Sequence, residues 1–105
     1  MYQATTPNHT YKLPIATSSC KTIQVSYKQG DKQLIWQSDG ADLPDGMTFD
    51  GNKVIIRLTQ EQTLGFNTKA PVTSQVRALT DDDDAFISRK FRISVKEAQN
   101  KEILK

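Results

Sequence analysis

The segment Thr22–Lys28 reads TIQVSYK, in which an apolar residue occupies every second position and polar residues fill the others. Successive side chains of a β-strand point to opposite faces of a sheet, so this alternation predicts a strand. We expect Ile23, Val25 and Tyr27 to be buried and the polar residues between them to face solvent. No comparably long helical pattern occurs elsewhere, and the sequence therefore predicts an antiparallel β-domain.

The same alternation predicts strands along the rest of the chain. They are expected at residues 9–13, 33–38, 47–49, 53–58, 72–79 and 86–95, with the strand above beginning near Cys20. Gly30 and Gly51 fall in turn sequences between strands, because glycine adopts backbone conformations that other residues resist. Thr59, with Gln62 three places later, is a capping box and predicts a single helical turn that ends at Gly65.

The last predicted strand, residues 86–95, has one irregular position. Phe91 and Val95 belong to its apolar face, and Ile87 is in phase with them, so we expect all three to point inwards. Arg89 interrupts this pattern near the start of the strand.

Short strands separated by turns are typical of a β-sandwich or a barrel. A helical turn between two strands favours an immunoglobulin-like antiparallel sandwich of about seven short strands. We expect residues 9–105 to form this single domain and the polar residues 1–8 to be a flexible leader. The charged tail, residues 96–105, is predicted as a short helix or as a terminal edge strand anchored by Ile103 and Leu104, and we favour the strand.

The 105 residues carry a net charge of +2 and one cysteine, Cys20, which cannot form an internal disulfide. The absence of disulfides favours a reducing compartment or a particle assembled inside a cell. The opening residues lack the basic and apolar parts of a signal peptide, and no run of about 20 apolar residues is long enough to span a bilayer. We therefore expect no membrane partner, and the small net charge gives no reason to expect nucleic acid.

A catalytic nucleophile needs a base beside it, and the only histidine is His9. A Cys20–His9 pair is conceivable, but no third group is in place to orient the histidine. We expect Cys20 to be a small apolar residue at a strand edge and His9 to be exposed, and alanine at either position to be silent. The sequence thus predicts no catalytic residues and no enzymatic activity. One cysteine and one histidine are also too few ligands for a zinc site.

The Asp81–Asp84 run is the most concentrated charge in the chain. Calcium loops space their ligands so that the backbone wraps the ion, whereas four consecutive aspartates point in different directions. We interpret the run as a solvated loop tip that keeps neighbouring strand ends apart, and we expect no metal or cofactor.

Arg89, Lys90 and Arg92 form a basic cluster on the last predicted strand. A nucleic-acid reader would add exposed aromatic rings for stacking on bases, but Phe91 falls on the inward face. We interpret the cluster as a solvated strand face, so nucleic acid is not an expected partner.

Trp36 shares a strand face with Leu34, which favours a place in the core. On an exposed sheet, the same side chain would stack on a sugar ring. The exposure of Trp36 therefore discriminates between a core residue and a carbohydrate-binding residue.

Four groups of residues carry a resemblance to a known family. They are Thr5–Pro7 with His9–Pro14, Val54–Phe66, Gln75–Thr80, and Ile93–Val95 with Ile103 and Leu104. In these segments the chain resembles a family of small tail-associated proteins encoded by phages and prophages of Gram-positive bacteria. The LTQEQT segment at Leu58–Thr63 also resembles amino-terminal β-domains of baseplate proteins from phages of the same hosts. The Asp81–Asp84 run and the Asp39–Asn52 connection fall outside the resemblance.

The resemblance implies a non-enzymatic virion structural or tail-assembly protein, made in the cytoplasm of the host bacterium and built into a virion. Its implied partners are other phage tail or baseplate proteins, together with further copies of itself. The resemblance carries over no catalytic, cofactor-binding or metal-binding residues. The alternative is a small β-sandwich module that binds carbohydrate or a cell surface.

Overall fold

The most regularly alternating segment forms the longest strand, β2 (Cys20–Gln29), in a computed structural model that describes residues Met1–Lys105. Its residues Ile23, Val25 and Tyr27 are fully buried, which confirms the predicted faces of this strand. The other strands are β1 (Asn8–Lys12), β3 (Lys32–Gln37), β4 (Met47–Asp50), β5 (Lys53–Arg57), β6 (Val72–Thr80), β7 (Ala85–Ile87) and β8 (Phe91–Ile93). The helical segments are the 3-10 turn η1 (Thr17–Ser19), which the sequence did not indicate, and α1 (Gln60–Leu64).

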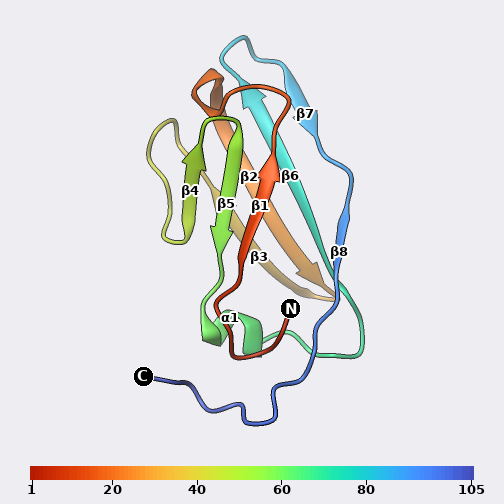
Figure 1. Cartoon of the computed structure of the whole chain (residues 1–105). Helices are drawn as coiled ribbons and strands as arrows, with labels where there is room; N and C mark the ends of the chain where they lie inside the picture. The colour runs from red at the N-terminus through yellow and green to blue at the C-terminus, as the bar shows by residue number, and fades with distance from the viewer.

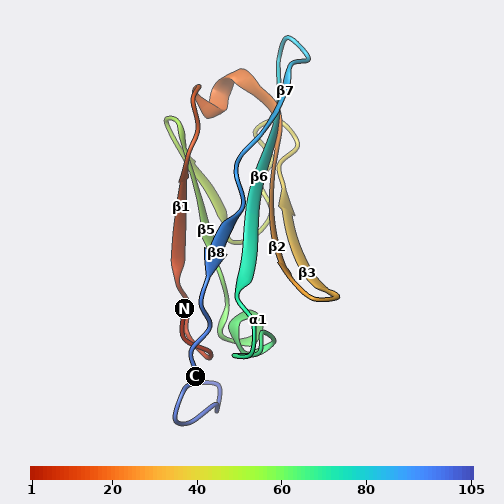
Figure 2. The same ribbon diagram turned by 90° about the vertical axis from the view of Figure 1, so that its right-hand side faces the viewer.

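These strands form two antiparallel sheets that face each other (Figures 1 and 2). One sheet has the order β1-β5-β4, and the other has the order β3-β2-β6-β7, with β8 also paired to β6. The prediction of an all-β sandwich is confirmed. Its likeness to immunoglobulin domains is one of architecture, because β2 and β3 share a sheet here and the second and third strands of an immunoglobulin domain do not.

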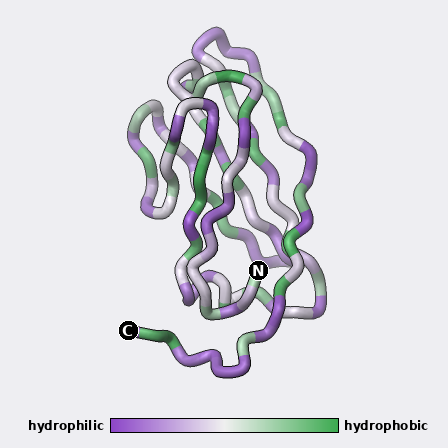
Figure 3. The backbone as a smooth tube through the Cα atoms, viewed as in Figure 1, coloured by the Kyte–Doolittle hydropathy of each residue, from purple (hydrophilic) through white to green (hydrophobic).

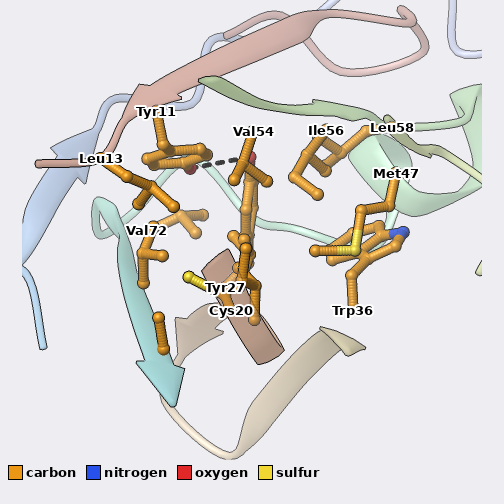
Figure 4. Packing of buried hydrophobic residues seen from close by; sticks show 14 of the residues in the cluster. Tyr11, Leu13, Cys20, Tyr27, Trp36, Met47, Val54, Ile56, Leu58 and Val72 are labelled. Carbon is orange, nitrogen blue, oxygen red and sulfur yellow. Dashed lines mark hydrogen bonds between the residues drawn. The ribbon is translucent and has the colours of Figure 1, made fainter. Parts of the chain in front are cut away.

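The core lies between the two sheets and draws apolar side chains from both. Its buried residues are Tyr11, Leu13, Cys20, Ile23, Val25, Tyr27, Trp36, Met47, Val54, Ile56, Leu58, Phe66, Val72, Val76, Ala78 and Val95. Figure 4 shows part of this cluster. Hydrophobic and hydrophilic positions alternate along the strands, while hydrophilic residues predominate in the loop at the upper end and in much of the tail (Figure 3). Burial of one such side chain contributes about 1.5–3 kcal/mol, so this two-sided core is the main source of stability.

The predicted turn and cap signals are confirmed. Gly30, in the turn between β2 and β3, and Gly51, in the turn between β4 and β5, both have positive φ. The Thr59 hydroxyl accepts the Gln62 N–H at 3.1 Å, and the Gln62 side chain accepts the Thr59 N–H at 2.8 Å. This reciprocal pair satisfies two groups that the start of α1 would otherwise leave without partners.

The strand predicted at residues 86–95 is divided into β7 and β8. The backbone of Ser88 donates to the Val76 carbonyl, and the Ser88 hydroxyl accepts the Val76 N–H, so a side chain replaces one bond of the ladder. Between Ile87 and Phe91, β6 advances by three residues while its partner advances by four. One extra residue reverses the faces of a strand, which explains why Ile87 is 58% exposed although Phe91 packs inwards.

Residues 1–8 were expected to form a flexible leader, but the structure pairs their beginning with the chain that follows β8. The Met1 ammonium donates to the Ser94 carbonyl at 2.7 Å, and the Gln3 N–H donates to the Lys96 carbonyl at 2.9 Å. Gln3 is buried. These bonds join residues 1–3 to the segment that follows β8, on one side of the sandwich (Figures 1 and 2). Their partners are distant in sequence, so no local pattern reveals them.

The tail, residues 96–105, does not form the favoured edge strand, and that prediction is wrong. Lys96 makes an isolated parallel bridge with Tyr2, and the chain beyond it has no regular structure. The side-chain amide of Gln60 accepts the Leu104 N–H and donates to the Leu104 carbonyl, each at 2.9 Å. A single side chain thus takes the backbone bonds that a neighbouring strand would have supplied.

Candidate functional site

A chain of four hydrogen-bonded side chains crosses the core between the two sheets. His9 and Tyr11 come from β1, Tyr27 from β2 and Ser74 from β6. The Ser74 hydroxyl lies 2.5 Å from the Tyr11 hydroxyl, which donates to the Tyr27 hydroxyl oxygen at 2.9 Å. The Tyr27 hydroxyl lies 2.6 Å from His9 Nδ1. Figure 4 shows the central Tyr11–Tyr27 bond as a dashed line between the sheets.

The donor and acceptor in each of these hydrogen bonds follow from the single proton that each hydroxyl carries. Because Tyr11 donates to Tyr27, Ser74 donates to Tyr11, and Tyr27 donates to His9 Nδ1. The acceptor Nδ1 therefore carries no proton, and the neutral ring holds its proton on Nε2. The chain satisfies three hydroxyls in the core, each of which would be costly to bury without a partner.

Burial holds all these groups in their neutral forms. It raises the pKa of the Tyr27 hydroxyl far above its usual range, and the neighbouring Tyr11 adds to that rise. Burial likewise raises the pKa of Tyr11. It lowers the pKa of His9, and the positive charge of the amino terminus lowers it further. The arrangement therefore suits a structural link between the sheets, because it suppresses the phenolate that a tyrosine base would need.

His9 is expected to make stability depend on pH. Its folded pKa lies below the unfolded value, so the unfolded chain binds a proton first as the pH falls. The contribution of His9 to the free energy of unfolding is fully present above about pH 6.5, and it is lost as the pH falls through the pKa of the folded state. Urea unfolding between about pH 7.5 and 5 measures this loss.

The variant His9→Asn is the matched control for this pH dependence. Its side-chain oxygen can accept from Tyr27 where Nδ1 does, but it does not titrate. Subtracting its stability profile from that of the wild-type protein removes the contribution of the carboxylates. Parallel profiles through pH 6 would contradict the assignment of this effect to His9.

The prediction that His9 is exposed is wrong. The ring is half-buried and stacks on Tyr27, with the ring centroids 5.6 Å apart. Replacing it with alanine would leave the Tyr27 hydroxyl without an acceptor, at a cost of about 1–3 kcal/mol, so the variant is not silent for stability. In the sequence, the signal for this role is that His9 is in phase with the apolar residues Tyr11 and Leu13.

The structure does not bring Cys20 and His9 together. His9 contacts Tyr27, which lies seven residues beyond Cys20 on the same strand, or about 23 Å in an extended chain. Cys20 is buried in the core at the start of β2, which confirms its interpretation as a small apolar residue. Burial raises the pKa of its thiol, and Asp81 adds to that rise, so the reactive thiolate is disfavoured.

The Asp81–Asp84 run forms the tip between β6 and β7, as predicted. All four residues are exposed, and the Asp83 carboxylate pairs with the Lys21 ammonium at 2.5 Å. The Thr80 hydroxyl accepts the Asp84 N–H at 3.0 Å and helps to close the turn. The run is therefore organised as a hairpin tip by its own backbone and by Thr80.

The basic cluster lies at the break between β7 and β8. Arg89, Lys90 and Arg92 are all exposed. The Arg89 guanidinium lies 4.6 Å from the centre of the Phe91 ring, and this ring meets Tyr11 edge-on in the core. The one aromatic ring beside the cluster is thus packed between Arg89 and the core.

Trp36 is buried, with 4% of its surface exposed, which confirms its predicted place in the core. Its Nε1 donates to the Asp45 carbonyl at 3.0 Å, and its ring meets the Tyr27 ring edge-on. Figure 4 shows Met47 beside it. The indole is therefore not positioned to stack on a sugar.

The surface hollow with the most charged lining includes Cys20 at its wall. This hollow, between η1 and the connection after β3, also includes Lys21, Asp39 and Asp81. No three His, Cys, Asp or Glu side chains are grouped so that they could hold a metal ion. No helix is both long enough and apolar enough to cross a bilayer.

No protein-family model matches this chain, and a search of curated proteins finds no match. The phage-tail resemblance carried by Val54–Phe66 and the other segments therefore stays a prediction.

Proposed function

We propose that this chain is a non-enzymatic structural component of a phage or prophage tail or baseplate, acting through contacts with other tail proteins. One observation carries the proposal: the side chains best suited to acid–base or nucleophilic chemistry are hydrogen-bonded to one another or buried. His9, Tyr11, Tyr27 and Ser74 bond to one another, and Cys20 is buried. The accessible features are strand edges, loop tips and an irregular tail, which are suited to binding other proteins.

The segments that carry the family resemblance support this proposal by their position. Val54–Phe66 comprises β5, the capped turn α1 and the fully buried Phe66, and Gln75–Thr80 lies in β6. These segments build the framework. The segments outside the resemblance, Asp39–Asn52 and Asp81–Asp84, include the long connection after β3 and the tip between β6 and β7. Surface loops are where related proteins differ in their partners, so these segments are the candidates for partner specificity.

The carbohydrate-binding alternative has no comparable support. It depended on an exposed Trp36, and this side chain is buried and bonded to Asp45. We therefore do not propose it.

Fractionation of phage particles from the host bacterium tests the proposed function. A phage whose copy of the gene carries an affinity tag is grown, and its tails are purified and probed for the tag. We expect the protein in tails or in tail-assembly intermediates, and we expect deletion of the gene to leave tails incomplete. Its presence only in intermediates would assign it to assembly and not to the mature virion. Intact, infectious tails without the protein would refute the proposal.

Cys20→Ala separates this role from an enzymatic one. Cys20 has no partner closer than the Ala16 carbonyl at 3.9 Å, so alanine keeps the fold at the cost of one small buried group. A deletion complemented with this variant should assemble tails as the wild-type gene does. Loss of assembly with a folded Cys20→Ala protein would point to chemistry at the thiol.

A further inference from the structure

The strand edges of the sandwich are unequally protected. On one side, bonds from Met1 and Gln3 join the segment before β1 to the chain after β8. At another edge, β4 is only four residues long and ends in Asp50. The edge formed by β7 and β8 is interrupted, and it carries Arg89 and Arg92. Short strands, charges and breaks are the devices that prevent an edge from pairing with another chain.

The free edge of β3 has no break and no charge along its middle. β3 pairs with β2 in an unbroken register and has no neighbour on its other side. Its one charged residue, Lys32, lies at the turn, with its ammonium 5.2 Å from the centre of the Phe66 ring. Gln33, Ile35 and Gln37 are exposed, and Ile35 keeps 52% of its surface in solvent.

The backbone groups on this edge can be assigned from one bond. The Ser38 N–H donates to the Ile23 carbonyl at 2.9 Å, so these residues face each other as a hydrogen-bonded pair. Such pairs alternate with non-bonded pairs along an antiparallel ladder. Gln33, Ile35 and Gln37 belong to the non-bonded pairs with β2. Their N–H and C=O groups therefore point away from β2, towards solvent.

We propose that the free edge of β3 pairs antiparallel with the same edge of a second copy of this chain, about a twofold axis at Ile35. In this register Ile35 faces its own equivalent, and Gln33 faces Gln37 of the second copy. Each of these pairs joins residues whose backbone groups point outwards, so each exchanges two hydrogen bonds. The two five-stranded sheets become one continuous sheet, and the two Ile35 side chains cover each other.

The charge pattern favours a second copy as the occupant. No charged residue lies between Gln33 and Gln37, so two identical edges meet without repulsion, and the edge offers no charge to attract an acidic or basic strand. Beyond Gln37 the chain leaves the edge, because the Asp39 N–H turns back to the Asp42 carbonyl. This inference does not rest on the proposed function, because it concerns the purified chain alone.

Sedimentation of purified protein tests the pairing. We expect the wild-type mass to rise from 11.8 kDa towards twice that value as its concentration approaches about 0.5 mM. Ile35→Lys and Ile35→Glu each place like charges opposite each other in the symmetric pair, so each should weaken self-association by about tenfold or more. An equimolar mixture of these two variants should restore a dimer, because opposite charges then meet at the axis.

Two further variants separate the backbone from the side chain. Ile35→Pro removes an N–H that makes no bond within the fold and should leave a folded monomer. Ile35→Thr keeps the N–H and the branched side chain and should still dimerise. Monomeric wild-type protein at about 0.5 mM would overturn the proposal, as would a dimer that Ile35→Lys does not weaken. A Lys and Glu mixture that stays monomeric would overturn the register. If the proline variant fails to fold, the charge variants decide.

Discussion

Replacing Val25 with aspartate is expected to leave the protein unfolded at 25 °C and neutral pH. Val25 has no exposed surface and lies in the middle of β2, between Trp36 of β3 and Val76 of β6. A buried carboxylate without a partner costs several kcal/mol, and domains of this size have a total stability of about 5–15 kcal/mol. Circular dichroism should show the loss of the strand signal. Acidification should restore part of it, because the protonated side chain costs less to bury.

Gln24→Asp is the matched control, one residue away on the other face. Gln24 is half-exposed, and its amide donates to the Gln37 side chain at 2.9 Å on the surface of the sheet. We expect a change of less than about 1 kcal/mol, since only this exposed bond is lost. Equal damage from Val25→Asp and Gln24→Asp would mean that the faces of β2 are assigned wrongly.

Gly46→Ala is expected to destabilise the protein by about 3 kcal/mol or more. Gly46 has a φ of +88°, and a Cβ atom there would lie 2.7 Å from the Arg57 carbonyl oxygen and 3.2 Å from Trp36 Nε1. The Gly46 carbonyl also accepts the Arg57 N–H at 2.7 Å, so the backbone cannot move away without loosening this bond. Urea unfolding followed by Trp36 fluorescence measures both the loss of stability and the change around the indole.

Gly40→Ala controls for backbone strain alone. Gly40 has a φ of +60°, but a Cβ atom there would meet nothing within 4 Å. We expect it to cost about 1 kcal/mol, the usual penalty for a left-handed residue with a side chain. Similar losses for Gly46→Ala and Gly40→Ala would show that the close approach of β5 to Gly46 is absent in solution.

Sequence reasoning succeeded where the determinants are local. The alternation around Val25, the turn at Gly30 and the cap between Thr59 and Gln62 each involve residues within a few positions of one another, and each is confirmed. It failed at Ile87, because the extra residue in the strand partner of β6 is set by Ser88 bonding across to another strand. Periodicity specifies the face of a residue only as long as the register is unbroken.

The candidate site was less predictable than the fold. Trp36 was placed correctly in the core, because its phase with Leu34 is visible in the sequence. Cys20 is out of phase with Ile23 and Val25, and its burial coincides with a register shift between Cys20 and Thr22 that alternation does not reveal. The four hydrogen-bonded side chains that cross the core were not predicted, because Tyr11 and Ser74 are 63 positions apart and meet only when the two sheets pack. The only sign of it in the sequence is that a histidine and two tyrosines occupy positions in phase with apolar residues of their strands. Core packing alone also produces that pattern.

The pairing of residues 1–3 with residues 94–96 also affects how this molecule folds. Met1 bonds to Ser94, 93 positions away, and Gln3 bonds to Lys96 in the same segment. Contacts of such long sequence separation carry a large closure entropy and are associated with slow folding. During synthesis, residues 1–3 must therefore remain unpaired until residues 94–96 have emerged, and a nascent chain stopped before residue 94 would have one seam of the sandwich open to chaperones and proteases.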